Sequence, residues 1–342
     1  MHRKIEEILT AAHLKDASDI HVASGEMVAV RLIGEISFLE ELGVMTKIDV
    51  LSMVTSMLDQ EALTILEDQK EHDFCHASAN GNRYRCNVFY QKGLLSLSMR
   101  HIKNELLNLD EIGTPEKIKS LLTKKQGLIL LSGPAGSGKS TTMAAMIDWI
   151  NSNRTDRIIM IEDPIEYFIE NKKCFISQRE IHSDTKSFSN SIRAAMRQDP
   201  NIIVIGEIRD RETMEAVMRL CNSGHLVIST IHTSSSSQAL YRILSMFPVG
   251  QHKAILSQLG DTLLGILNQR LVRSLNEKRI AIFEFMLANL AIKNAVRNGD
   301  IAQIENSIAT GAIDGMQTFK HHIQHLALTG KINYAETISI VE

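Results

Sequence analysis

The stretch Gly133-Pro134-Ala135-Gly136-Ser137-Gly138-Lys139-Ser140 lies between an apolar run, 128–131, and a helix-like segment that starts at Thr141. It matches the pattern G-x-x-x-x-G-K-[ST] in full, with the preceding strand and following helix that the pattern requires. Glycines let consecutive backbone N–H groups turn inward around phosphate oxygens, and the first helical turn adds unpaired donors and a positive dipole end. A chance glycine turn that caps a helix is the alternative, but this context favours a nucleotide site in which Lys139 reaches the β- and γ-phosphates and Ser140 ligates Mg²⁺.

Length and composition limit what surrounds this site. A chain of 342 residues exceeds the size at which one core keeps growing, so two or three domains are expected. The hydrophobic fraction of 44% and charged fraction of 23% are ordinary for a soluble protein, and a net charge of −3 argues against a primary nucleic-acid partner. No apolar run is long enough to span a membrane and no signal-peptide core is visible, so no membrane insertion and a cytoplasmic location are expected. The four scattered cysteines, Cys75, Cys86, Cys174 and Cys221, are expected to be reduced thiols.

Hydrophobic spacing divides the chain into two regions. Residues 3–14 and 47–67 have helical spacing, and strand-like runs surround them, with a hairpin expected at Asn80-Gly81. These features predict one compact α+β domain. After a connector at 104–115, short apolar runs alternate with helices at 128–131, 158–161, 202–205, 226–231 and 280–285, which predicts a parallel sheet covered on both faces. From 288 onward the sequence is helical, with Gly299, Gly311 and Gly330 as expected helix terminators.

Charged residues follow two of these strand-like runs, and histidines flank a third. Glu162, Asp163 and Glu166 come after 158–161, and Glu207 and Arg209 come after 202–205. Carboxylates at strand ends beside a phosphate loop can hold Mg²⁺ through water or orient the attacking water, although solvated strand-end charges are the simpler alternative. His225 and His232 flank the run 226–231, and strand alternation does not decide whether either faces the site.

Four segments, in this order and spacing, resemble the boxes of a known family. GPAGSGKSTT, IEDPIE, MRQDPNIIVIGEIRD and GHLVISTIHT are similar to the Walker A, aspartate, Walker B and histidine boxes of the type II/type IV secretion ATPases. The chain most resembles the PilT-like pilus retraction ATPases. The segment ASDIHV, at 17–22, is similar to the start of their PAS-like domain, and the tail, SIATGAIDGMQT, is also similar. The additional N-terminal domain and the four-cysteine zinc motif of assembly ATPases are expected to be absent. Ala135, Asn201 and the segment AIKNAVRNGD depart from the family pattern.

The resemblance implies an α/β fold with an N-terminal PAS-like α+β domain at 1–103, a linker at 104–115, a RecA-like P-loop ATPase domain at 116–287 and a C-terminal helical region at 288–342. It implies ATP and Mg²⁺ as cofactors. ATP would be bound by Gly133, Pro134, Ala135, Gly136, Ser137, Gly138, Lys139, Ser140 and Thr141, with Ser140 on the metal. Glu207 would be the catalytic carboxylate and Glu166 would assist it. Coupling roles would fall to His225, His232, Glu162, Asp163 and Arg209, and phosphate contacts to Arg85, Arg100, Arg193 and Arg197.

The function implied is that of a homohexameric ATPase that powers type IV pilus retraction. Such a ring would act in the cytoplasm, peripherally associated with the inner membrane, on a pilus platform protein, with another pilus ATPase as a further partner. A pilus-assembly or type II secretion ATPase, a DNA-translocating RecA-like ATPase and an ATP-gated scaffold are the alternatives. The net negative charge argues mildly against DNA translocation. The presence of Lys139 and Glu207 argues against a scaffold that binds ATP without turnover.

Overall fold

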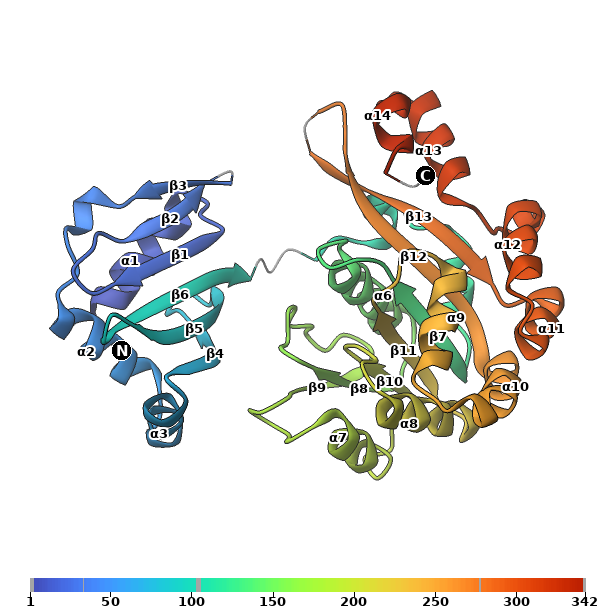
Figure 1. Cartoon of the computed structure of the whole chain (residues 1–342), viewed down its shortest axis with the longest axis horizontal. Helices are drawn as coiled ribbons and strands as arrows, with labels where there is room; N and C mark the ends of the chain where they lie inside the picture. Colours follow the sequence, from blue (N-terminus) through green and yellow to red (C-terminus); the bar gives the residue numbers. More distant parts are fainter. Residues whose placement is uncertain (1–2, 33, 103–105, 277, 341–342) are drawn as a thin grey trace. The chain divides into compact units, whose positions relative to one another are not determined.

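The computed structural model describes residues 3–32, 34–102, 106–276 and 278–340, and the chain folds as two compact units, Met1–Glu105 and Leu106–Glu342 (Figure 1). Residues 104 and 105 of the predicted linker lie outside the described residues. A short helix, α4 (Leu109–Ile112), begins with a capping box at Asn108, and its Leu109 and Ile112 are buried in the core of the second unit. This part of the predicted linker therefore belongs to the second unit.

The first unit is an antiparallel sheet with helices. Its strand order is β3-β2-β1-β6-β5-β4. The strands are β1 (Asp19–Ala23), β2 (Ala29–Leu32), β3 (Glu35–Phe38), β4 (Glu71–Ala77), β5 (Arg83–Gln91) and β6 (Leu94–Ile102). The helices are α1 (Arg3–Leu14), α2 (Lys47–Met57) and α3 (Gln60–Gln69), with a 3₁₀ turn at Glu40–Leu42.

Local sequence accounts for most of this unit. Ile5, Ile8, Leu9 and Ala12, the predicted apolar face of α1, are buried. The predicted hairpin at Asn80-Gly81 is confirmed, since Gly81 adopts a φ of +81° in the turn between β4 and β5. The predicted single helical stretch at 47–67 is two helices. Leu58 leaves the helical conformation at the end of α2, and the side chain of Asp59 caps a new helix by accepting the N–H of Ala62.

The second unit is built on a seven-stranded sheet of order β13-β12-β7-β11-β10-β8-β9. The strands are β7 (Gly127–Ser132), β8 (Arg157–Glu162), β9 (Phe175–Glu180), β10 (Ile202–Ile205), β11 (Leu226–Ile231), β12 (Leu263–Arg273) and β13 (Arg279–Leu287). All pairings are parallel except that of β12 with β13. The run at 280–285, predicted as a parallel strand, is therefore antiparallel, because it returns directly from β12 through a short hairpin. The strands β9 and β12 were not predicted.

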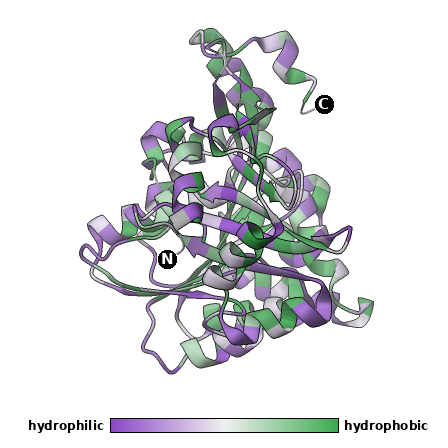
Figure 2. Cartoon of the chain, turned by 90° about the vertical axis from the view of Figure 1, so that its left-hand side faces the viewer, coloured by the Kyte–Doolittle hydropathy of each residue, from purple (hydrophilic) through white to green (hydrophobic). Residues whose placement is uncertain are grey.

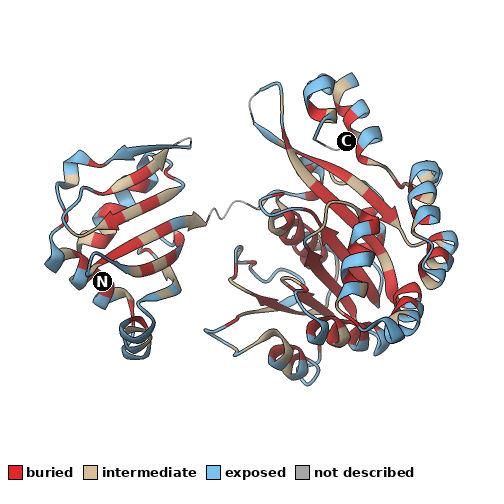
Figure 3. Ribbon diagram, in the orientation of Figure 1, coloured by how far each residue is buried: buried red, intermediate tan, exposed pale blue. Residues whose placement is uncertain are grey.

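Helices cover both faces of this sheet, as predicted. They are α4, α5 (Ile118–Leu122), α6 (Lys139–Asn153), α7 (Phe188–Ala195), α8 (Arg211–Asn222), α9 (Ser236–Ser245), α10 (His252–Thr262), α11 (Leu290–Asn298), α12 (Ile301–Thr310), α13 (Phe319–Leu328) and α14 (Tyr334–Ile338), with 3₁₀ turns at Val249–Gln251 and Gly311–Asp314. Ile129 and Leu131 of β7 pack in the core with α4 to α6, whereas Leu128 and Leu130 pack in the core with α7 to α12. Figure 3 shows the central strands of this sheet buried along most of their length, and Figure 2 shows helices with hydrophilic and hydrophobic residues side by side.

The region from 288 onward is helical, as predicted. Gly299 caps α11 in the left-handed conformation, and Gly330, also left-handed, follows the end of α13. Gly311 ends α12 at a φ of −85° and starts a 3₁₀ turn, so it terminates the helix without a left-handed cap. Within the ranges that the structure describes, no helix combines the length and apolar character needed to cross a bilayer.

Candidate functional site

The phosphate-binding loop joins the end of β7 to the start of α6. Gly133 has a φ of +149°, and Gly138 caps α6 with a φ of +83°. A Cβ on Gly133 would lie 2.3 Å from the carbonyl oxygen of Gln269, and one on Gly138 would lie 2.9 Å from its Nε2 atom. The hydroxyl of Ser137 is buried without a hydrogen-bond partner among the described residues. A close-packed glycine loop with an unpaired hydroxyl fits a phosphate group.

Lys139 lies within this loop. Its Nζ atom donates hydrogen bonds to the carbonyl oxygens of Gly133 and Pro134, each at 2.8 Å. Burial lowers the pKa of Lys139, and the negative charges of Glu207 and Glu166 oppose that shift. The predicted loop lysine and the two predicted carboxylates thus share one electrostatic environment.

Glu207 lies where the ends of three parallel strands converge. It follows β10, while Asp163 follows β8 and His232 follows β11. The Nε2 atom of His232 is 3.2 Å from one oxygen of Glu207, and the guanidinium of Arg209 binds the other oxygen and reaches Asp163 at 3.1 Å. Glu207 is the main cause of the raised pKa of Arg209. Four predicted residues from three strand ends are therefore joined by contacts.

Glu162, the last residue of β8, differs from Glu207 in its surroundings. It is buried, and burial raises the pKa of its carboxyl to about 7. The Nε2 atom of Gln178 on β9 donates a hydrogen bond to it at 3.1 Å, which acts in the opposite direction. Burial thus sets the pKa of Glu162 well above that of an exposed glutamate.

Hard oxygen donors are available for a magnesium ion at the start of α6. Ser140 lies in the first turn of that helix, directly after Lys139. Among the residues that the structure describes, no group of three or more His, Cys, Asp or Glu side chains could hold a metal. Mg²⁺ at nucleotide sites usually takes one or two protein oxygens together with phosphate oxygens and water, so a serine hydroxyl near a phosphate loop fits this ion.

Two residues of β12 contact the elements on either side of the loop and were not predicted. The Oε1 atom of Gln269 accepts the hydroxyl hydrogen bond of Thr142 on α6 at 2.7 Å. The Nδ2 atom of Asn268 donates to Ser132 at 2.6 Å and to the carbonyl oxygen of Thr233 at 3.3 Å. All four side-chain partners are buried polar groups. Two adjacent amides directly after the apolar run 263–267 were the signal that could have identified them.

His225 is not brought to this site. It precedes β11, whereas His232 follows it, and the two ends of a strand of six residues lie about 20 Å apart. Its Nδ1 atom contacts the carbonyl oxygen of Leu220 at 3.1 Å and Ser223 at 3.0 Å. Residues that flank a strand occupy opposite edges of the sheet, so His225 and His232 are not brought together within one chain, and the coupling role expected for His225 stays a prediction.

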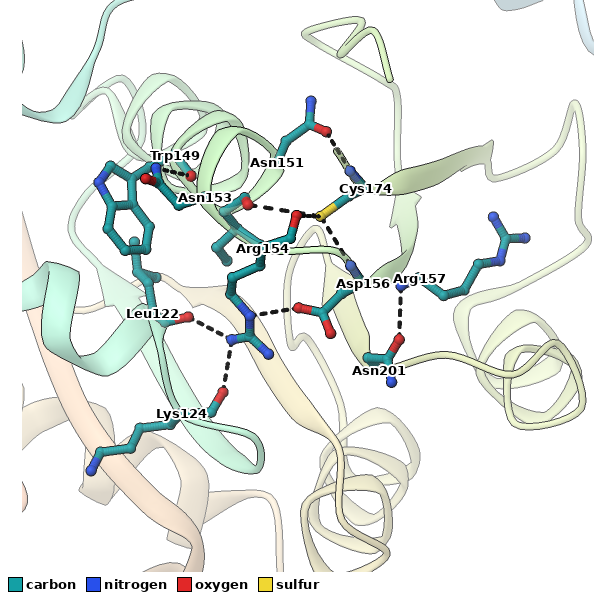
Figure 4. A network of polar contacts seen from close by, with 11 residues as sticks. Leu122, Lys124, Trp149, Asn151, Asn153, Arg154, Asp156, Arg157, Cys174 and Asn201 are labelled. Atoms are coloured by element: carbon teal, nitrogen blue, oxygen red, sulfur yellow. Dashed lines mark hydrogen bonds and ion pairs between the residues drawn. The ribbon is translucent and has the colours of Figure 1, made fainter. Parts of the chain in front are cut away.

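Asn201, a departure from the family pattern, also lies at the edge opposite the phosphate loop. It precedes β10, and its side-chain oxygen accepts the backbone N–H of Arg157 at the start of β8 at 2.8 Å (Figure 4). The same close-up shows Arg154 bound to Asp156 and to the carbonyl oxygens of Leu122 and Lys124. Asn201 thus supports the starts of two strands and does not contact the predicted catalytic residues.

The four predicted arginines are divided between the two units. In the first unit, Arg100 on β6 binds Asp19 at 2.8 Å and is paired in register with Arg85 on β5. In the second unit, Arg193 on α7 contacts Ser189 and Asn190, both at 3.1 Å. Arg197 is exposed just beyond the end of α7. Their predicted phosphate contacts remain predictions.

Comparison with known proteins identifies the family. The type II/IV secretion system protein family matches residues 1–331. The type IV pilus retractation ATPase PilT of Pseudomonas aeruginosa is 34% identical over 329 residues, which cover 96% of this chain and 95% of that protein. A twitching motility protein of Neisseria gonorrhoeae is 36% identical over 282 residues, covering 82% of this chain and 75% of that protein.

A solved structure extends this likeness to three dimensions. The crystal structure of the pilus retraction motor PilT with bound ADP superimposes with a TM-score of 0.91 at 38% identity, over 97% of this chain and 95% of that chain. The predicted α/β fold with an N-terminal domain and a helical C-terminal region is confirmed, as is the predicted class of ATPase. The chain belongs to the type II/IV secretion system protein family and is similar to PilT-like ATPases along nearly its whole length.

Proposed function

We propose that this chain is a Mg²⁺-dependent ATPase that powers type IV pilus retraction as a homohexameric ring. The observation that carries the proposal is the contact set at Glu207: a carboxylate between Arg209 and His232, in the electrostatic field of the loop lysine. The likeness to PilT over both units supports the retraction part.

Each site residue has a proposed task. The backbone N–H groups of 133–138 and the ammonium of Lys139 bind the phosphates, and Ser140 binds Mg²⁺, which offsets charge on the transferred phosphoryl group. Glu207 accepts a proton from the attacking water. The oxygen of that water bonds to the γ-phosphorus while the bond between the γ-phosphorus and ADP breaks. Glu166 assists by orienting that water.

His232 and Arg209 hold the Glu207 carboxylate in place. Because Arg209 also binds Asp163, a change at one strand end is passed to another. Glu162, through its buried titratable carboxyl, contributes to this coupling. Arg85, Arg100, Arg193 and Arg197 are proposed to contact phosphates in the assembled ring, where an always-charged planar group suits developing negative charge.

The ring is proposed to act in the cytoplasm, on the inner face of the inner membrane. Its partners would be a membrane-embedded pilus platform protein and a second pilus ATPase, with no nucleic acid. Changes in the angle between the two units would turn the platform and withdraw pilin subunits from the filament.

The deciding experiment compares wild type with Glu207→Gln and Lys139→Ala. We expect the wild type to hydrolyse ATP as a particle of six chains, Glu207→Gln to bind ATP with turnover reduced at least a hundredfold, and Lys139→Ala to lose binding. Cells that carry Glu207→Gln should keep surface pili and fail to retract them, whereas bald cells would indicate an assembly motor. Full turnover in Glu207→Gln would refute the assignment of the catalytic carboxylate.

A further inference from the structure

The segment 163–174 joins β8 to β9 and contains neither helix nor strand, yet it carries Glu166. Glu166 itself is exposed. A carboxylate on such a segment can assist a reaction at the phosphate loop only if the segment is held at a fixed distance from that loop. The polar contacts along the segment indicate what holds it.

On one side, β9 holds the segment through two side chains. The Oε1 atom of Gln178 accepts the N–H of Ile169 at 2.9 Å, and its Nε2 atom donates to the carbonyl oxygen of Tyr167 at 2.7 Å and to Glu162 at 3.1 Å. A carboxylate oxygen of Glu180 accepts the N–H of Ile165 at 3.0 Å. These bonds fix the backbone on either side of Glu166.

On the other side, α6 holds the segment at two places. Far from the phosphate loop, the Nδ2 atom of Asn151 donates to the carbonyl oxygen of Glu170 at 2.7 Å, and Asp148 binds Lys172 at 2.7 Å. At the near end, the hydroxyl of Tyr167 lies 2.8 Å from the Oγ1 atom of Thr141. Thr141 is two residues after Lys139, and Asp148 is about two helical turns further along α6.

The Tyr167–Thr141 contact therefore joins the residue next to Glu166 directly to the phosphate loop helix. The ring of Tyr167 is partly buried against the core beneath α6, so the side chain is anchored by packing as well as by its hydroxyl. Phenylalanine at this position keeps the ring and removes only the hydrogen bond, which makes the role of the hydroxyl separable from that of the ring.

We propose that Tyr167 is a positioning residue: its hydroxyl, through Thr141, sets the distance between Glu166 and the phosphate loop. This inference rests on the assisting role proposed for Glu166. It predicts that Tyr167→Phe lowers the kcat for ATP hydrolysis by about threefold to tenfold, the range of one net hydrogen bond, and leaves KM within about twofold. A purely structural role would lower the melting temperature and would not separate kcat from KM.

A double-mutant cycle tests the contact itself. Thr141→Val removes the partner hydroxyl and Thr141→Ser keeps it. In the Thr141→Val chain, adding Tyr167→Phe should not lower kcat any further. In the Thr141→Ser chain, adding Tyr167→Phe should lower kcat by the same factor as in the wild type. Tyr241→Phe, at an exposed tyrosine of α9, is the matched control and should leave kcat unchanged. Independent, multiplying effects of Tyr167→Phe and Thr141→Val would overturn the proposal, as would an unchanged kcat in Tyr167→Phe.

Amide hydrogen exchange supplies a readout that does not depend on turnover. We expect Tyr167→Phe to speed exchange at the amides of 165–169 by about threefold or more and to leave the amides of β7 unchanged. Unchanged exchange at 165–169 would overturn the positioning role. If the wild-type chain does not hydrolyse ATP, the proposed function fails, and this measurement still decides whether the hydroxyl orders the segment.

Discussion

Removal of the hydroxyl of Thr142 tests the buried contact between α6 and β12. Thr142 is 0% exposed and Gln269 is 2% exposed, and their side chains are joined by a hydrogen bond of 2.7 Å. Valine matches threonine in shape, so Thr142→Val leaves a buried amide oxygen without its donor, at a cost of about 2 kcal/mol. For a unit the size of Leu106–Glu342, that loss lowers the melting temperature by about 4–8 °C.

The assay is thermal unfolding followed by circular dichroism, at one protein concentration and without nucleotide. Thr310→Val is the matched control, since the hydroxyl of Thr310 is exposed and bonds only to a carbonyl oxygen of its own helix in the contacts described for it. That variant should change stability by no more than about 0.5 kcal/mol. A melting temperature of Thr142→Val within about 2 °C of the Thr310→Val value would refute the reasoning.

A second variant separates the lost hydrogen bond from a packing defect. Replacing both partners, Thr142→Val with Gln269→Leu, removes the unpaired amide together with its donor. The double variant should regain more than half of the stability lost by Thr142→Val alone. Further loss in the double variant would indicate that Gln269 stabilises the unit by packing and not by this bond.

Three further predictions concern pH and backbone geometry. The pKa of Glu162 is raised from 4.5 to about 7, so the folded state binds more protons between these values and stability falls as pH rises from about 4.5 to 7; Glu162→Gln should remove that fall in urea titrations across this range. The pKa of His322 is lowered from 6.5 to about 4 by burial, so stability falls as pH drops from about 6.5 to 4; His322→Asn, which keeps an acceptor for the backbone N–H it binds, should flatten this slope. Gly133→Ala should abolish ATP binding in calorimetry, because its Cβ would lie 2.3 Å from the carbonyl oxygen of Gln269, whereas Gly250→Ala meets no atom within 4 Å and should bind ATP normally.

The parts of the site that sequence predicts are those set by short-range pattern. The phosphate loop is a local motif, and Glu207, Asp163 and His232 follow apolar runs whose parallel pairing brings their ends together. The same rule places His225 at the opposite edge of the sheet, because it precedes β11 and does not follow it.

The parts that sequence did not predict depend on long-range packing. Gln269 meets Thr142 across 127 positions and Asn268 meets Ser132 across 136, and no local pattern specifies which strand lies beside β7. The antiparallel direction of β13 was not predicted for a related reason, since an apolar run of residues does not indicate which way the strand runs in the sheet. Pairing of Tyr167 with Thr141 likewise depends on how the segment after β8 folds back on α6.

The position of β12 affects how the phenotypes of mutants of this protein are interpreted. Three consecutive residues of that strand make these contacts. Asn268 binds the end of β7, just before the phosphate loop, and Gln269 binds α6. Arg270 donates to the carbonyl oxygens of Ser234 and Ile340. The side chain of Arg270 thus joins the last helices to the segment that follows His232, so a substitution in those helices can disturb that segment. A motility defect that maps to the last helices therefore does not by itself identify a surface for another protein, and ATP turnover of such a mutant has to be measured before its phenotype is assigned to lost binding.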